Sequence, residues 1–225
     1  MANVDDAVIL AGGRGTRMLP ASIYVPKEIM PLVDTPILNH LIWEASKAMV
    51  KRIHIVISPE KRDILAKIIN YSSDYFDGSV RPDLPRFALN PLPKGIKIIV
   101  HEQLNPGGVG DAILLASKNI NGPFLVLLGD NLLINDHIDP QKSGPKYASN
   151  CCKKMVDYFN KTGISCAGIL EVSDKDVNKY GIVELDGSLI RSIIEKPDIY
   201  EAPSNFILCG RYLLSINSDE MLKLY

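Results

Sequence analysis

The chain has 225 residues, 46% of them hydrophobic and 23% charged, which is enough to bury a sizeable core as one large or two small domains. Its formal net charge of −1 predicts no nucleic-acid partner, and no apolar run is long enough to predict a membrane partner. The acidic N-terminus lacks the layout of a signal peptide, so we expect a cytoplasmic protein.

The first half of the sequence alternates between strand-like and helix-like patterns. Apolar runs predict buried strands at 7–11, 53–57, 96–100 and 124–128. Apolar residues at helical spacing predict helices at 38–49, 64–69 and 112–116. This alternating order favours a parallel sheet with helices on its faces.

The second half has a different texture. Proline-rich and polar stretches at 71–94 and 135–150 are typical of surface insertions. Residues 181–185, a turn at Asp186-Gly187 and residues 189–194 predict an antiparallel hairpin, and a further strand follows near 206–214. We therefore predict an α/β fold: a Rossmann-like mixed, mainly parallel sheet flanked by helices, with a smaller antiparallel part.

A glycine-dense turn follows the first predicted strand. Residues 12–17 read Gly-Gly-Arg-Gly-Thr-Arg, and Lys27 lies shortly beyond in Pro-Lys-Glu. Glycines let backbone N–H groups approach phosphoryl oxygens, and the cations neutralise phosphate charge. The turn lacks the Gly-Lys-Ser/Thr of a Walker loop, and Met18 replaces the third glycine of a dinucleotide fingerprint. An ordinary strand-to-helix turn with incidental arginines is the other interpretation.

Asp130 ends a later apolar strand, in Leu-Leu-Gly-Asp-Asn. Ligands bind beyond the carboxyl ends of strands in open parallel sheets, so this carboxylate is expected at the same edge as the glycine-dense turn. There it is suited to holding Mg²⁺ together with substrate phosphates. The alternative role is to cap the segment that follows.

Two further motifs carry binding chemistry. Gln103 precedes a glycine-rich run that includes Gly108, and its amide offers the donor and acceptor that match the edge of a pyrimidine. Glu195-Lys196-Pro197 ends a strand in the second half, where glutamate suits sugar hydroxyls and lysine suits a sugar phosphate. Each motif alone also has a purely structural interpretation. The Gln103 run is then a loop that leads into a helix, and Glu195-Lys196-Pro197 is an exposed surface turn.

The four cysteines contain no Cys-x-x-Cys pair, and the four histidines are scattered. This pattern predicts free thiols and no thiolate zinc site.

Taken together in this order, the motifs identify a resemblance that covers essentially the whole chain. The sequence resembles the sugar-1-phosphate nucleotidylyltransferases, most closely the bacterial glucose-1-phosphate uridylyltransferases, or UDP-glucose pyrophosphorylases. The likeness is carried by 10–20, Pro26-Lys27-Glu28, 31–34, 103–112, Tyr180-Gly181, Glu195-Lys196-Pro197, 202–205 and 210–212.

The resemblance implies direct displacement of pyrophosphate from UTP by glucose 1-phosphate, with Mg²⁺ as cofactor and UDP-glucose as product. It assigns the nucleotide to Leu10, Ala11, Gly12, Gly13, Arg14, Gly15, Thr16, Gln103 and Gly108. It assigns catalytic contacts with the phosphates to Arg17 and Lys27, and the metal to Asp130. Gly181 and Glu195 would meet the glucose hydroxyls, and Lys196 the sugar phosphate. A nucleotide-binding half (1–134), a sugar-phosphate-binding half (135–225) and a homo-oligomer are also implied.

Three departures from the family pattern shape these expectations. Relatives usually continue well past residues 210–212, and residues 218–225 read as the start of an uncapped helix, so we expect the sequence to continue beyond Tyr225. Asp111 stands where relatives commonly carry histidine or glutamine, and would oppose phosphate binding unless it faces away. Gly129-Asp130-Asn131 is closer to the thymidylyl branch.

Rival functions remain open. One is transfer of a thymidylyl group, or use of another sugar 1-phosphate. Another is a regulatory homologue that binds nucleotide sugars without turning them over. A redox Rossmann enzyme is the third, and it would need the glycine that Met18 replaces.

Overall fold

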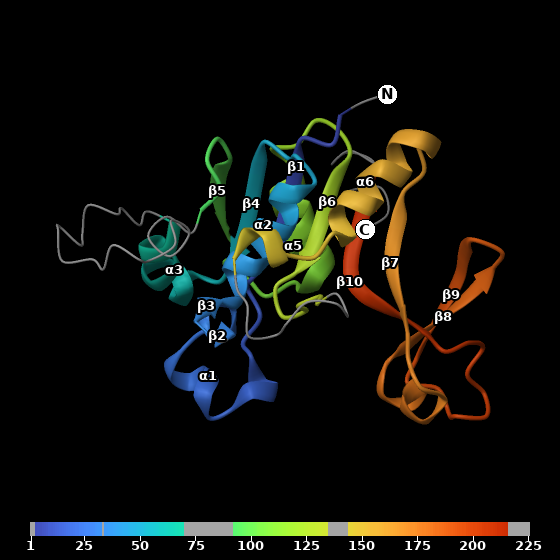
Figure 1. Ribbon diagram of the computed structural model, residues 1–225. Coiled ribbons are helices and arrows are strands. Elements are labelled where there is room, and N and C mark those ends of the chain that lie inside the picture. The colour runs from blue at the N-terminus through green and yellow to red at the C-terminus, as the bar shows by residue number, and fades with distance from the viewer. Residues whose placement is uncertain (1–2, 33, 70–91, 135–143, 216–225) are drawn as a thin grey trace.

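The computed structural model describes residues 3–32, 34–69, 92–134 and 144–215 (Figure 1). Their main feature is an eight-stranded sheet with the order β5-β4-β1-β6-β10-β8-β9, in which β7 also pairs with β10. Its parallel strands are β1 (Asp6–Leu10), β4 (Arg52–Ile57), β5 (Lys97–Glu102) and β6 (Phe124–Leu128). Its antiparallel strands are β7 (Cys166–Glu171), β8 (Gly181–Asp186), β9 (Leu189–Glu195) and β10 (Phe206–Leu214). The predicted mixed sheet is confirmed.

The α-helices described are α1 (Ala21–Tyr24), α2 (Ile37–Lys47), α3 (Arg62–Ile69), α5 (Gly108–Ser117) and α6 (Cys151–Thr162). Short 3₁₀ turns are η1 (Thr16–Met18), η2 (Lys27–Ile29), η3 (Pro59–Lys61), η5 (Pro145–Tyr147) and η6 (Asp174–Lys179). A small separate ribbon joins β2 (Pro31–Leu32) to β3 (Thr35–Pro36). No helix in the described ranges has the length and apolar character that crossing a bilayer requires.

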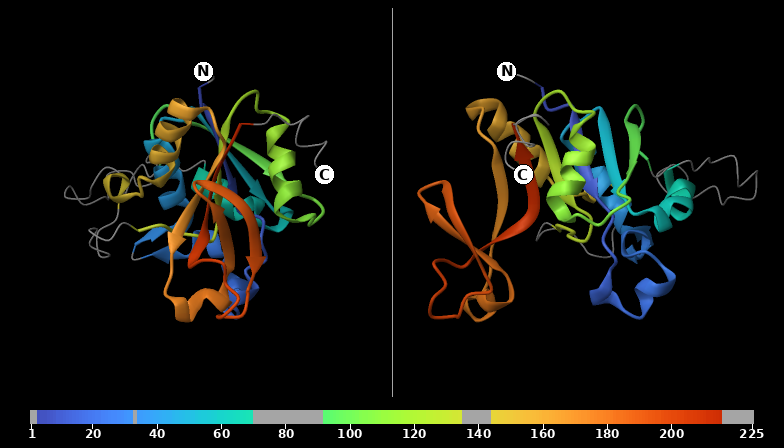
Figure 2. Two further views of the ribbon diagram at one scale, coloured as in Figure 1. Left: turned by 90° about the vertical axis from the view of Figure 1, so that its right-hand side faces the viewer. Right: turned by 180° about the vertical axis from the view of Figure 1, so that it is seen from behind.

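Helices cover both faces of the parallel strands, as Figure 2 shows in its left view. On β1, Ala7 and Ile9 point into a core shared with α2 and α6, whereas Val8 points into a second core shared with α5. Because a strand turns alternate side chains to opposite faces, a strand covered on both faces reads as a continuous apolar run. This explains why the sequence pattern located these strands.

Most predicted elements are present, with ends that differ by a few residues. The hairpin predicted at 181–194 is β8–β9, and the strand predicted at 206–214 is β10. The sequence pattern did not yield α6 and β7. Most of the predicted insertion at 71–94 lies outside the described residues, which omit 70–91. Residues 135–143 of the second predicted insertion and the helix start predicted from Ser218 also lie outside them. The four cysteines are free thiols, as predicted.

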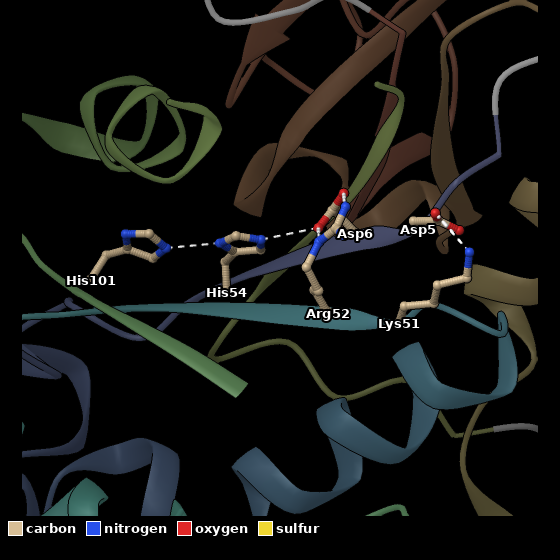
Figure 3. Close-up of polar contacts among 6 residues, drawn as sticks. All are labelled: Asp5, Asp6, Lys51, Arg52, His54 and His101. Carbon is tan, nitrogen blue, oxygen red and sulfur yellow. Dashed lines mark hydrogen bonds and ion pairs between the residues drawn. The ribbon is translucent and has the colours of Figure 1, made fainter. Parts of the chain in front are cut away.

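A chain of polar side chains crosses β1, β4 and β5 (Figure 3). The Asp6 carboxylate accepts hydrogen bonds from Arg52 Nε (2.5 Å) and Nη2 (2.7 Å), and lies 3.1 Å from His54 Nε2. Since a carboxylate accepts, His54 donates from Nε2, and its Nδ1 accepts from His101 Nε2 at 2.8 Å. Both ring nitrogens of His54 therefore have a hydrogen-bond partner, even though His54 is fully buried.

Candidate active site

The loop after β1 is held close to the ends of both neighbouring strands. The Ala11 N–H donates to the Val56 carbonyl (2.7 Å), and the Gly129 N–H donates to the Leu10 carbonyl (2.9 Å). A Cβ at Gly129 would lie 2.3 Å from Leu10 O, so this approach of β6 to β1 requires glycine. Gly15 turns the loop at a φ of 68°. The glycine-dense turn thus lies at the carboxyl ends of β1 and β6.

Lys61 fixes the position of this loop through hydrogen bonds to its backbone. Its Nζ donates to the carbonyls of Ala11 and Gly13, each at 2.7 Å, and to Glu28 Oε2 at 2.9 Å. Lys61 is 5% exposed, and Glu28 is fully buried. Burial raises the pKa of the Glu28 carboxyl, against the opposing effect of the Lys61 charge. Sequence reasoning missed Lys61, because a lone lysine in a Ser-Pro-Glu-Lys turn carries no motif.

Lys27 and Asp130 form the centre of the candidate site. They are 103 residues apart, yet Lys27 Nζ donates to Asp130 Oδ2 at 2.8 Å. Burial acts to raise the pKa of Asp130, but the hydrogen bond and charge of Lys27, with a contribution from Arg17, outweigh it and hold that pKa below its usual value. Asp130 is therefore a carboxylate at neutral pH, placed directly against a cation.

The cations surround a hollow beside the loop. Its volume is about 320 Å³, and its lining includes Gly13, Arg14, Lys27 and Lys61. A Cβ at Gly13 would come within 3.3 Å of Lys27 Nζ, so the lysine lies against the glycine backbone. Arg17, in η1, is exposed. This combination of backbone N–H groups, cations and open volume is suited to a polyphosphate.

Gln103 lies on the other side of the loop. It follows β5, and its Oε1 is 3.5 Å from where a Cβ on Gly12 would stand. Its Nε2 donates to Asp111 Oδ2 at 2.6 Å and to the Gly108 carbonyl at 3.2 Å. The Asp111 carboxylate is therefore turned to the Gln103 amide. That Asp111 would oppose phosphate binding unless it faces away stays a prediction.

The predicted sugar-phosphate residues lie on the β8–β9 hairpin. Gly181 and Glu195 are register partners, and a Cβ at Gly181 would come within 2.9 Å of Glu195 Oε2. Lys196 has a positive φ of 46°, and its Nζ is 3.9 Å from Glu195 Oε1. In the sheet order β9 is separated from β6 by β10 and β8. Figures 1 and 2 show the start of β8 and the α1 region projecting on the same lower side of the molecule.

The donor set around Asp130 is compatible with Mg²⁺. In the part of the chain that the structure describes, no three His, Cys, Asp or Glu side chains gather as metal ligands. Asp130 supplies one ionised carboxylate whose side chain is 46% exposed. Mg²⁺ is commonly held by one or two carboxylates, with water and substrate phosphates completing its shell. The residues present fit a metal that binds together with a nucleotide.

A buried ion pair supports the segment after β6. Arg211 on β10 donates from Nε (3.0 Å) and Nη2 (2.8 Å) to the Glu44 carboxylate of α2, and from Nη2 to the Asn131 carbonyl at 2.8 Å. Both charged side chains are at most 1% exposed. Arg211 therefore fixes the backbone next to Asp130. It lies in the Gly-Arg-Tyr run that carried the resemblance, although that motif assigned it no contact.

Comparison with known proteins places the chain in a family. The sequence model described as Nucleotidyl transferase matches residues 6–223. A UTP–glucose-1-phosphate uridylyltransferase of Streptococcus pyogenes is 32% identical over 238 residues, which cover 99% of this chain and 73% of that protein. A UDP-glucose pyrophosphorylase solved with UDP-glucose is 28% identical, with a TM-score of 0.75 over 94% of this chain and 76% of that one. A UTP-bound enzyme from Acinetobacter baumannii is also 28% identical, with a TM-score of 0.80 over 97% and 76%. This chain, with its glycine-dense loop and facing Lys27 and Asp130, belongs to the nucleotidyl transferase family.

Proposed function

We propose that the protein transfers a uridylyl group from UTP to glucose 1-phosphate, giving UDP-glucose and pyrophosphate. The observation that carries the proposal is the Lys27–Asp130 pair, which faces the glycine-dense loop at the ends of adjacent parallel strands. The similarity to uridylyltransferases that bind UTP and UDP-glucose supports the same reaction.

The proposed reaction is a single in-line displacement. An oxygen of the glucose 1-phosphate attacks the α-phosphorus of UTP, and the bond from that phosphorus to the pyrophosphate oxygen breaks. No protein nucleophile is needed, so the chain acts by positioning and by neutralising charge. Leu10 to Gly13, Gln103 and Gly108 would hold the nucleoside, and Arg14, Gly15 and Thr16 the phosphates of the nucleotide.

Five charged side chains, together with Gly181, would carry out the remaining functions. Arg17 offers a planar fork for two oxygens of the departing pyrophosphate, and Lys27 acts as a point charge. Lys196 would bind the sugar phosphate, while Gly181 and Glu195 orient the glucose hydroxyls. Asp130 would hold Mg²⁺, whose chemistry there is to offset the negative charge of the phosphates.

The test is pyrophosphate release by the purified protein with Mg²⁺. UTP, dTTP, GTP and ATP are each supplied with and without glucose 1-phosphate. Release that requires both UTP and glucose 1-phosphate is the expected result. Release with dTTP in preference to UTP would move the protein to the thymidylyl reaction. Binding of UDP-glucose without any release would instead support a regulatory homologue.

A further inference from the structure

The Gln103 amide is held by two groups that can only accept hydrogen bonds. These are the Asp111 carboxylate, 2.6 Å from Nε2, and the Gly108 carbonyl, 3.2 Å from it. An amide oxygen in that position would face two acceptors, so the nitrogen must point there. An amide NH₂ group has two hydrogens, and here both are used.

What remains of Gln103 for a ligand is its oxygen. Oε1 lies on the Gly12 side, 3.5 Å from the place a Cβ on that glycine would occupy. Gly12 belongs to the loop that carries the proposed nucleoside site. The edge that Gln103 presents there is therefore an acceptor alone, without a donor.

Asp111 is itself fixed in place. It lies in the first turn of α5, where the exposed N–H groups of the helix favour a carboxylate. A Cβ on Gly107 would come within 2.7 Å of Asp111 Cγ, so the aspartate packs on a position that only glycine leaves open. The carboxylate thus has a defined orientation.

We propose that Asp111 is a positioning residue that sets the Gln103 amide so that its oxygen reads the base, selecting bases with an imino N–H over cytosine. Uracil and thymine carry a hydrogen on N3 and can donate it to Oε1. Cytosine has an unprotonated N3, which would meet Oε1 as a second acceptor. The inference rests on the proposed function, because it assumes that a pyrimidine nucleotide occupies this loop.

Two variants separate positioning from charge. Asp111→Ala and Asp111→Asn both remove the negative charge, but asparagine keeps an oxygen that accepts from Gln103 Nε2. We measure kcat/KM for UTP and for CTP with glucose 1-phosphate and Mg²⁺, and the affinity for each nucleotide by calorimetry. For Asp111→Ala the preference for UTP over CTP falls by about tenfold or more, since a charge-assisted hydrogen bond no longer sets the amide. For Asp111→Asn it stays within about threefold of wild type.

The other outcomes overturn one claim or both. An unchanged UTP preference in Asp111→Ala, or equal effects of the two variants, overturns the positioning role in favour of a charge effect or no effect. Wild-type protein that binds UTP in preference to CTP but releases no pyrophosphate leaves the inference supported and overturns the proposed reaction. Wild-type protein that binds neither nucleotide overturns both. Thermal unfolding of each variant confirms that it is folded.

Discussion

Arg17 is an exposed cation of the candidate site, and Lys27 is a more enclosed one. Both contribute positive charge to the surroundings of Asp130. Only Lys27 makes a direct hydrogen bond to that carboxylate, with 13% of its side chain exposed. The two cations therefore differ in how far a substitution would disturb the structure. Among the described residues, replacing Arg17 removes only its longer-range charge interaction with Asp130, whereas replacing Lys27 leaves Asp130 without its hydrogen-bond partner.

Arg17→Ala should lower kcat by on the order of 100-fold while leaving thermal unfolding unchanged, because removing one donor to the developing charge has costs of this size. Lys51→Ala is the matched control. The Lys51 side chain is 64% exposed. Lys51 immediately precedes β4, so it lies at the end of the parallel strands opposite to the candidate site. Steady-state pyrophosphate release checks both. Near-normal turnover by a folded Arg17→Ala protein would remove Arg17 from the proposed reaction.

Lys61→Met should destabilise the protein by about 3–5 kcal/mol, because it leaves the buried Glu28 charge without its partner. The carbonyls of Ala11 and Gly13 also lose their donor. Urea unfolding measures the change. In the double variant Lys61→Met/Glu28→Gln no uncompensated charge remains, so we expect part of the loss to be recovered. A double variant as unstable as the single one would show that the charge is not the cause.

Neighbouring elements are coupled by the polar chain through β1, β4 and β5 (Figure 3). Burial lowers the pKa of His101, and the nearby His54 ring adds to the effect. For Asp6, burial acts to raise the pKa, but hydrogen bonds from His54 and Arg52 outweigh it and lower that pKa below the usual value. Lowering the pH is therefore expected to reduce the stability of these strands in two separate pH ranges, one set by His101 and a lower one set by Asp6.

The shifted pKa of His101 makes folding stability depend on pH. Its pKa is lower in the folded protein than in the unfolded chain, so as pH falls below 6.5 the unfolded chain takes up the proton first and stability decreases. His101→Gln retains a donor for His54 but does not titrate. We expect urea unfolding between pH 7.5 and 5 to show a flatter decline for this variant. Parallel declines in the two proteins would contradict the assignment.

Asp6 acts at lower pH. Because its folded pKa is depressed, its contribution to stability is complete above the unfolded value near 3.8 and is lost as pH falls below that value and through the lower folded pKa. This part of the decline should persist in His101→Gln.

Several elements were predictable because their signal is local. β1, β4 and β6 are apolar runs buried on both faces, whereas the edge strand β5 is an apolar run that is only half-buried. Helix α2 places Leu38, Leu41, Ile42 and Ala45 on one face at helical spacing. Helix α6 was missed although Cys152, Met155 and Phe159 also have helical spacing, since most of its remaining residues are polar or exposed. Strand β7 has three exposed residues at its end and no alternation. Neither element stands out from sequence without its partners.

The residues of the candidate site also divide into those with a local sequence signal and those without one. Motifs written in one stretch of sequence located the glycine-dense loop, Asp130 and Gln103. Lys61 and Arg211 act on those motifs from other segments, so their roles depend on contacts that only folding creates. Asp111 lies in the same run as Gln103, but its hydrogen bond with the Gln103 amide is likewise a contact that only folding creates. The sugar-phosphate roles of Glu195 and Lys196, the division at residue 134 and the homo-oligomer stay predictions.

For the whole molecule, β10 is the strand that joins the two kinds of pairing. It is antiparallel to β6 on one side and pairs with β7 and β8. Arg211 on this strand reaches both α2 and the backbone beside Asp130. Arg211 thus connects the antiparallel strand β10 both to α2, through a buried ion pair, and to the segment after β6, through a hydrogen bond.

Arg211→Met should destabilise the whole fold by about 3–5 kcal/mol, because Glu44 would remain buried and unpaired. Arg211→Lys should cost less, about 1–3 kcal/mol, since a lysine keeps the charge but cannot reach both carboxylate oxygens and the Asn131 carbonyl in one plane. Guanidinium unfolding followed by circular dichroism ranks the three proteins. Equal stability of the lysine variant and wild type would argue against the fork geometry.

The central place of β1 bears on how the protein is made. Asp6 pairs with Arg52 of β4 on one side and with Phe124 of β6 on the other. During synthesis β1 acquires its first neighbour early, but its second edge keeps unpaired N–H and C=O groups until residues 124–128 leave the ribosome. A pause in translation between β5 and β6 would lengthen the time for which a nascent chain exposes that apolar edge. The yield of folded protein is therefore expected to be sensitive to elongation rate over that stretch of the message.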